Sequence, residues 1–341
     1  MKTVFIMRGG TGIGDLLMTT PLPRLLVAEG YDVDVGVWPK NRAVMEANPF
    51  VRALVPYPEG QEQLLDWQAK IETGYDRVID LGYTLEKKFL HRTDGFFGPI
   101  PSMEARRAAA AGKNYYTETR LAAGIEQSPG FDRPEIYASQ EENGILDRYR
   151  HELKKDGRKQ LFWNLNGSTK NKFLSKGLQY IKAVLAQVPG SIHHIITGTN
   201  FDAANLPDDP RVRIATWTLR TSILLTQLVD VVIGPESGLV NAAGSYDTPK
   251  VILYSHSAPE NLGGHFLNHY PICPECDCHP CYLIPLDWRE TWDPSPRAMA
   301  RQFDQECRAR AKSDPYRSLG YRCTWELPDQ QIIDTIVKIL T

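Results

Sequence analysis

Apolar positions along this chain follow two alternating patterns. Short runs rich in Val, Ile and Leu predict buried strands, and in the first half they cover residues 3–7, 33–37, 51–55 and 77–81. Segments whose apolar residues recur every three or four positions predict helices at residues 16–29, 41–48 and 61–73. We expect Pro21 and Pro23 to kink the first of these helices without ending it.

The second half of the chain repeats this alternation. Strands are predicted at residues 161–165, 193–197, 229–233 and 251–254. Helices are predicted at residues 177–187, 219–228 and 239–244. A charged helix at 141–155 and the polar stretch 155–159 separate the two halves, and residues 329–340 have helical spacing.

Strand–helix alternation in both halves predicts an α/β fold class, with two tandem Rossmann-like domains facing a cleft. A chain of 341 residues is also larger than most single domains. We expect an N-terminal domain at 1–155, a C-terminal domain with a cysteine-rich tail at 156–325 and a C-terminal helix at 326–341. Ligands of open α/β sheets bind at the carboxyl ends of the strands, so one cleft would serve both domains.

Composition narrows the classes of function. The formal net charge is -2, which argues against strong non-specific binding to nucleic acid or to an anionic membrane. No apolar run reaches the roughly 20 residues of a membrane-spanning helix. The first apolar run is too short for a signal peptide, and we expect a cytoplasmic protein.

A glycine-rich turn follows the first predicted strand. Gly10, Gly12 and Gly14 fall at two-residue intervals, which is not the spacing of a dinucleotide-binding fingerprint, and no P-loop lysine is present. Asp15 comes next, where a helix begins. Two interpretations are open and compatible: Asp15 caps the helix, or it faces the cleft as a general base.

Residues 12–21, Gly-Ile-Gly-Asp-Leu-Leu-Met-Thr-Thr-Pro, resemble the opening of the heptosyltransferases, glycosyltransferase family 9. The resemblance implies the GT-B architecture and an inverting, metal-independent reaction with Asp15 as base. It also implies that Gly12 and Gly14 lie at the donor, that an ADP-sugar is the favoured donor, and that a heptose-like sugar moves to a glycan or lipopolysaccharide acceptor.

Two further segments resemble donor-binding parts of that family. Residues 164–172 form a polar loop after a strand, in which Ser168, Thr169, Lys170 and Lys172 are candidates for contacting the donor diphosphate. A plain polar loop is the other interpretation, and the choice between the two lysines stays open.

The second segment is the block at 234–243. Glu236, Ser237 and Gly238 open a helix whose N-terminus could bind phosphate. Trp217 lies upstream at the family's spacing for a nucleobase contact, followed by Thr218. Glu236 replaces the family's usual aspartate, and Asn241 replaces its usual histidine. Glu236 could hold a ribose hydroxyl or orient a lysine.

All six cysteines lie after residue 272. Clustered cysteines in a reducing compartment favour a metal site over disulfides. We expect a structural zinc on Cys278, Cys281, Cys307 and Cys323, and none on Cys273 or Cys276; free thiols or disulfides are the alternatives. In the N-terminal half, four basic residues are either solvated or available to an acidic acceptor: Arg106, Arg107, Lys113 and Arg120.

These features together predict an inverting glycosyltransferase that uses a nucleotide-sugar donor. Two other functions stay open: a phage-type glycosyltransferase acting on modified DNA bases, which would make nucleic acid the acceptor, and a non-catalytic nucleotide-sugar-binding protein. The near-neutral charge argues mildly against the first, and the changes at Glu236 and Asn241 keep the second open.

Overall fold

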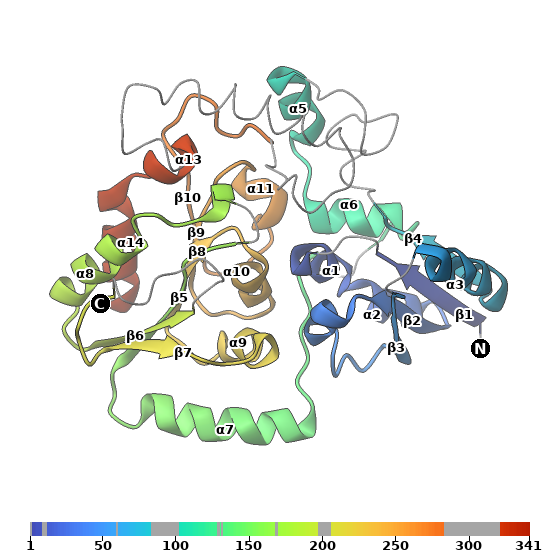
Figure 1. The fold of residues 1–341 in the computed structure, drawn as a ribbon, viewed down its shortest axis with the longest axis horizontal. Helices are drawn as coiled ribbons and strands as arrows, with labels where there is room; N and C mark the ends of the chain where they lie inside the picture. The colour runs from blue at the N-terminus through green and yellow to red at the C-terminus, as the bar shows by residue number, and fades with distance from the viewer. Residues whose placement is uncertain are drawn as a thin grey trace.

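The computed structural model describes residues 2–8, 12–58, 61–82, 102–127, 130, 132–167, 170–196, 206–282 and 321–341. These residues form two parallel β-sheets that lie side by side, each with its own helices (Figure 1). The α/β class with two Rossmann-like sheets is therefore confirmed. None of the described helices is long and apolar enough to cross a membrane.

The first sheet has the strand order β3-β2-β1-β4, and all its pairs are parallel. Its strands are β1 (Lys2–Met7), β2 (Tyr31–Val37), β3 (Ala53–Pro56) and β4 (Arg77–Asp80). Val4, Phe5 and Ile6 of β1 are fully buried, although successive side chains of a strand point to opposite faces. Both faces of this sheet are therefore covered, as expected for parallel strands.

The second sheet has the order β10-β9-β8-β5-β6-β7, again with every pair parallel. Its strands are β5 (Lys159–Asn164), β6 (Ser191–Ile196), β7 (Val212–Ala215), β8 (Val231–Pro235), β9 (Lys250–Leu253) and β10 (His269–Ile272). β7 and β10 were not predicted: each has four residues, and exposed or half-exposed positions interrupt their apolar pattern.

The helices of the first half include two that the apolar pattern did not predict, α5 and α6. The elements are α1 (Ile13–Thr19), α2 (Leu22–Ala28), the 3-10 helix η1 (Pro39–Val44), α3 (Gln61–Gly74), α5 (Met103–Ala110) and α6 (Tyr115–Ala122). The single helix expected at 16–29 is in fact two helices, α1 and α2. Pro21 is the N-cap of α2 and has no N–H to continue α1, so it ends the first helix.

Helix α7 (Gln140–Lys154) passes from one half to the other along the lower edge of the molecule (Figure 1). The helical elements after it are η3 (Lys170–Lys172), α8 (Gly177–Gln187), α9 (Leu219–Leu225), α10 (Gly238–Ala242), η5 (Ala243–Ser245), α11 (Pro259–Leu262), α13 (Arg322–Trp325) and α14 (Asp329–Leu340). α14 buries Ile332, Ile336 and Leu340 in the core of the second sheet, so the end of the chain belongs structurally to the second half.

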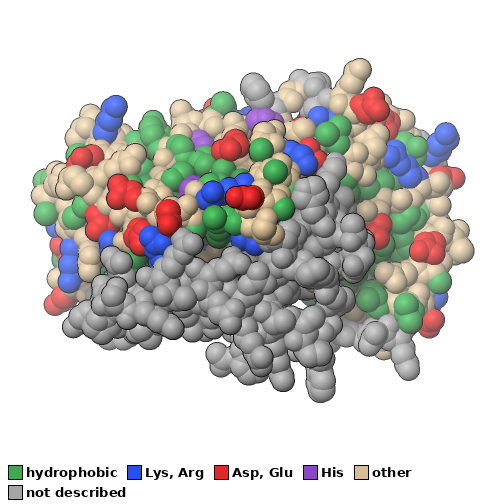
Figure 2. All heavy atoms as spheres, turned by 90° about the horizontal axis from the view of Figure 1, so that it is seen from above, with side chains coloured by type: hydrophobic (Ala, Val, Ile, Leu, Met, Phe, Trp, Pro, Cys, Tyr) green, Lys and Arg blue, Asp and Glu red, His purple; other side chains and the backbone are tan. Residues whose placement is uncertain are grey.

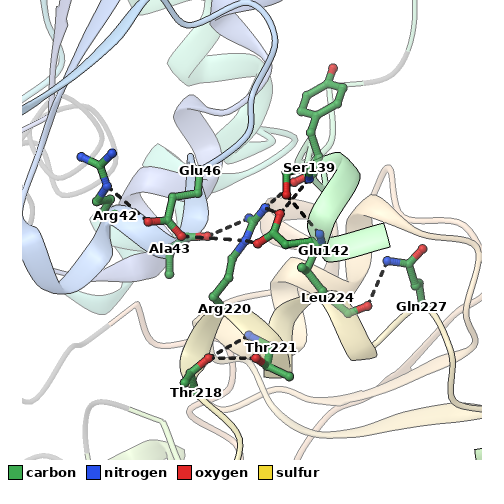
Figure 3. Close-up of polar contacts among 11 residues, drawn as sticks. Arg42, Ala43, Glu46, Ser139, Glu142, Thr218, Arg220, Thr221, Leu224 and Gln227 are labelled. Carbon is green, nitrogen blue, oxygen red and sulfur yellow. Dashed lines mark hydrogen bonds and ion pairs between the residues drawn. The ribbon is translucent and has the colours of Figure 1, made fainter. Parts of the chain in front are cut away.

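The two halves are joined by packing as well as by the chain. One hydrophobic cluster includes Val4 and Leu17 from the first half and Val232 and Leu239 from the second. At one edge, Arg220 of α9 donates to both carboxylate oxygens of Glu142, at 2.6 and 2.8 Å, and to the carbonyl oxygen of Ala43 at 3.0 Å (Figure 3). Arg220 therefore connects the second half to α7 and to η1.

Candidate active site

Asp15 lies in the first turn of α1. Its Oδ1 accepts a hydrogen bond from Nη2 of Arg8 at 3.0 Å, and a quarter of its side chain is exposed. The N-cap residue is Gly12, which makes no side-chain cap, so the expectation that Asp15 caps this helix is wrong. A carboxylate in the first turn still benefits from the helix dipole, and it remains accessible for proton transfer.

Arg8 holds Asp15 in place from β1. Its Nη1 donates to the carbonyl oxygen of Leu81 at 2.7 Å, directly after β4, and its side chain is buried. The two contacts fix the guanidinium between neighbouring strand ends. Sequence analysis did not identify Arg8, although an arginine at the end of a buried strand beside a candidate base was a usable signal.

The two glycines expected at the donor lie at the start of α1. A Cβ at Gly12 would lie 3.3 Å from Oδ2 of Asp15, so this glycine leaves room for the carboxylate at the start of α1. A Cβ at Gly14 would meet no atom within 4 Å.

The turn from β8 into α10 lies opposite α1. Ser237 is the N-cap of α10; its Oγ accepts from the N–H of Val240 at 3.4 Å and from Nδ2 of Asn164 at 2.7 Å. Gly238 touches the first half: a Cβ there would lie 1.9 Å from Cγ1 of Ile13. The turn that carries Asp15 and the turn that carries Ser237 therefore face each other at the junction of the two halves.

Glu236 is completely buried under this turn. Its Oε1 accepts from Oγ of Ser255 at 2.8 Å and lies 2.5 Å from Nδ1 of His256, and its Oε2 accepts from Oγ of Ser257. Burial raises the pKa of Glu236, but His256, Lys172 and the hydrogen bonds outweigh it and hold the pKa well below the usual range. Glu236 is thus a buried anion that organises the loop after β9.

Gly167 and Lys172, on either side of residues 168–171, are paired with each other, and Gly167 lies beside Ser237. The N–H of Gly167 donates to the carbonyl oxygen of Lys172 at 2.8 Å, and Asn166 pairs with Phe173 in an isolated bridge. Lys172 is half-buried and close enough to Glu236 to lower its pKa. Lys170 begins η3, while Ser168 and Thr169 lie outside the described residues.

Trp217, Thr218 and Asn241 belong to the second half, at helices α9 and α10. The Trp217 ring stacks on Phe162 with a centroid distance of 6.0 Å and an interplanar angle of 11°. Thr218 is exposed and is the N-cap of α9. Asn241 of α10 is buried, and its Oδ1 has no hydrogen-bond partner.

Four cysteines pack together, and we call them the thiol cluster: Cys276, Cys278, Cys281 and Cys323. A hydrogen bond from Cys276, aided by the charge of Arg322, lowers the pKa of Cys278 to about 6 against the effect of burial. Cys276, which is not among the expected zinc ligands, thus packs with the other three cysteines. Cys273 packs against the main core instead.

The donor chemistry of the thiol cluster suits zinc or another soft metal ion. However, no three His, Cys, Asp or Glu side chains within the described ranges are arranged to hold a metal ion. Cys307, the remaining expected ligand, lies outside those ranges.

Three of the basic residues considered for the acceptor have other partners. Arg106 is fully buried and donates to the carbonyl oxygen of Cys281 at 2.7 Å, and Arg107 donates to that of Pro280 at 2.9 Å. Arg120 is buried against Asp132 at 3.0 Å. These hydrogen bonds hold the fold together, and of the three arginines Arg106 and Arg120 are buried. On the described part of the upper face, acidic and basic side chains are interspersed (Figure 2).

No protein-family model and no curated protein matches the sequence. Solved structures do match. A glycosyl transferase of family 9 from Veillonella parvula superposes with a TM-score of 0.64 at 15% identity, covering 99% of this chain and 97% of that one. ADP-heptose lps heptosyltransferase II of E. coli gives a TM-score of 0.57 at 16% identity, covering 89% of this chain and 98% of that one.

A third structure, the dodecameric iron-containing heptosyltransferase TibC in complex with ADP-D-beta-D-heptose, gives a TM-score of 0.60 at 13% identity and covers 99% of this chain and 76% of that one. The likeness extends over both sheets. This chain has the GT-B fold. In a GT-B fold the carboxyl ends of both sheets border one cleft, and Asp15 and Ser237 occupy those ends here.

Proposed function

We propose that this protein is an inverting glycosyltransferase that moves a sugar from a nucleotide-sugar donor to a hydroxyl of a glycan or lipopolysaccharide acceptor. The observation that carries the proposal is the contact between Ile13 and Gly238. It brings the candidate base Asp15 of one half against the donor-side turn at Ser237 of the other. A GT-B enzyme needs a base and a donor site on opposite sides of its cleft.

In the proposed reaction, Asp15 removes the proton from an acceptor hydroxyl, and the oxygen attacks the anomeric carbon of the donor. The bond from that carbon to the diphosphate oxygen breaks, and the diphosphate leaves with the bonding electron pair. Because Arg8 holds Oδ1 of Asp15, the carboxylate meets the acceptor in a fixed orientation.

The leaving diphosphate gains negative charge. The loop at 165–172 would stabilise this charge through the ammonium group of Lys172 and through the backbone N–H groups of the loop. We assign Ser168 and Thr169 to the same role from their place in this loop. Glu236 acts indirectly, since its buried charge holds the loop at 255–257 and attracts Lys172. We propose an ADP-sugar, with a heptose-like sugar, as donor, because two of the similar structures are described with ADP-heptose.

We further propose that Cys278, Cys281, Cys307 and Cys323 hold a structural metal ion such as zinc. Support comes from the packing of Cys276, Cys278, Cys281 and Cys323 against one another. The metal would tie the segment at 276–281 to α13, far along the chain, and would take no part in transfer.

The test of the function is a thermal-shift and calorimetric screen against ADP-, UDP- and GDP-sugars. Each nucleotide that binds is then assayed for release of nucleoside diphosphate with glycan acceptors. We expect ADP and an ADP-sugar to bind and Asp15→Asn to stop turnover. A protein that binds none of the nucleotides, or that turns over normally with Asn at position 15, contradicts the proposal.

A further inference from the structure

A buried asparagine of the second half bonds to the first half at the end of the junction away from Arg220. Asn261 lies in α11 and is completely buried. Its Nδ2 donates to the carbonyl oxygens of Ala110 at 2.9 Å and of Lys113 at 2.7 Å, and its Oδ1 accepts from Oη of Tyr282 at 2.7 Å. Because Ala110 is the last residue of α5, a side chain of one half caps a helix of the other.

Asn114 makes the reciprocal contact from the first half. Its Oδ1 accepts from the N–H groups of Tyr116 and Thr117 and so caps α6. Its Nδ2 donates to the carbonyl oxygen of Glu260, the neighbour of Asn261, at 2.9 Å. We call Asn114 and Asn261 the asparagine clamp. Each amide uses both its oxygen and its nitrogen, so neither side chain can turn away without leaving polar groups unpaired.

The asparagine clamp completes a row of contacts along the junction. Helices α9, α10 and α11 follow one another along the side of the second half that faces the first half (Figure 1). Each of the three contributes one contact: Arg220 of α9 with Ala43, Gly238 of α10 with Ile13, and Asn261 of α11 with the end of α5. With contacts at both ends and in the middle, neither end of the junction can open without breaking hydrogen bonds of a buried side chain.

The helix that Asn114 caps leads to the candidate base. α6 packs against α1, which carries Asp15. Tyr116 of α6 and Leu17 of α1 belong to the same hydrophobic cluster. A contact from α11 to the start of α6 therefore also places α1, and with it the distance from Asp15 to the turn at Ser237 in the second half.

We propose that the asparagine clamp fixes the width of the cleft, so that the two halves do not close when the donor binds. Domain enzymes of this shape commonly close around their ligands by a hinge, and the asparagine clamp prevents that motion here. Asn114 and Asn261 are positioning residues, since they act on Asp15 through α6 and α1. Their role in transfer rests on the proposed function, whereas the fixed junction stands without it.

Small-angle X-ray scattering of the full chain, with and without saturating ADP, measures closure directly. We expect the same radius of gyration in both samples, because the junction already holds the halves together. A smaller radius with ADP bound overturns the inference. Calorimetry on the same samples shows whether ADP is bound.

Hydrogen exchange on two variants tests the junction without any nucleotide. Asn114→Ser keeps a good N-cap for α6 but loses the donor to Glu260, and Asn261→Ser loses the donor to α5. We expect exchange in α5, α6 and α11 to rise roughly threefold to tenfold in each variant, while α14 exchanges as in the wild type. Asn143→Ser, at an exposed position of α7, is the control. Exchange equal to that of the control in both variants overturns the inference.

Kinetics on the same variants separates the inference from the proposed function. We expect Asn114→Ser to lower kcat roughly threefold to tenfold with the KM for the donor unchanged, because the donor contacts lie in the second half. The stoichiometry of ADP binding corrects for any loss of folded protein. Faster exchange in a protein that binds no nucleotide contradicts the proposed function and leaves the fixed junction standing. Turnover by a protein whose radius shrinks with ADP, or an unchanged kcat in both variants, does the reverse.

Discussion

Gly238, the first residue of α10, lies directly against Ile13 of α1, and a Cβ added there would come within 1.9 Å of Cγ1 of the isoleucine. We expect Gly238→Ala to force the halves apart, to destabilise the protein by about 1–3 kcal/mol and to reduce transfer. Urea unfolding and nucleoside diphosphate release measure these effects. The double change Ile13→Ala with Gly238→Ala should recover part of both.

The control for this pair is Gly144→Ala in α7, where a Cβ would meet no atom within 4 Å. It should be neutral or stabilise the protein by up to about 1 kcal/mol. If Gly238→Ala behaves in the same way, the contact between the two halves does not limit the size of the side chain at position 238.

Asp15→Asn should lower kcat by roughly 10²–10⁴-fold, because the amide cannot take the acceptor proton. Affinity for ADP, measured by calorimetry, should stay within error of the wild type. Asp334→Asn, on the exposed face of α14, serves as a control that changes the same charge far from the cleft. Equal kcat values for the two variants would remove Asp15 as the base.

Glu236→Gln should lower the free energy of unfolding by about 1–3 kcal/mol at neutral pH, because it replaces a buried carboxylate that accepts hydrogen bonds from Ser255 and Ser257. The pKa of Glu236 is depressed in the folded state, so its contribution is present above the unfolded pKa of about 4.3 and is lost as pH falls below it. Urea unfolding of wild type and variant at a series of pH values checks this. The gap between them should narrow in acid, and a constant gap would show that the carboxylate charge plays no part.

Removal of single cysteines should show which thiols hold the expected metal. Purified protein should contain about one zinc per chain by elemental analysis. Cys→Ser changes at 278, 281, 307 and 323 should each release it, whereas Cys276→Ser should not, although Cys276 packs in the thiol cluster. Cys273→Ser is the control, since Cys273 packs against the main core. A metal-free protein that melts at the same temperature as the metal-loaded sample contradicts the site.

Arg220→Met should destabilise the protein by about 1–3 kcal/mol, because it removes the donor to the partly exposed carboxylate of Glu142 and to two carbonyl oxygens. A double-mutant cycle with Glu142→Gln measures the coupling. Lys at position 220 cannot make the paired contacts to both carboxylate oxygens, so Arg220→Lys should recover little. Full recovery by lysine would mean that charge alone matters here.

Local patterns predicted most of the strands that build the two sheets, because buried parallel strands are continuous apolar runs. They also placed the start of a helix at Ser237, where the N-cap chemistry is local. The patterns did not predict α5 and α6, whose buried faces are made of Ala, Arg, Thr and Glu as much as of large apolar residues.

The site was harder to predict, since its contacts join residues far apart in sequence. Nothing near Arg106 indicates that the carbonyl oxygen of Cys281 is its partner. The buried partners of Glu236 at 255–257 follow a different strand. Asn114 meets Glu260 only because α6 packs against α11. Spacing along the chain contains none of this information.

The carboxylate of Glu142 also closes the first turn of α7, where it accepts from the N–H of Ser139 at 2.7 Å in a capping box. The same carboxylate of Glu142 thus caps the N-terminus of α7 and binds Arg220. The connection from the first half to the second is therefore held in a fixed geometry at the start of α7 and is not a flexible linker. Extra residues inserted before Ser139 should leave the relative orientation of the two sheets unchanged. An insertion between Ser139 and Glu142 should rotate one sheet relative to the other.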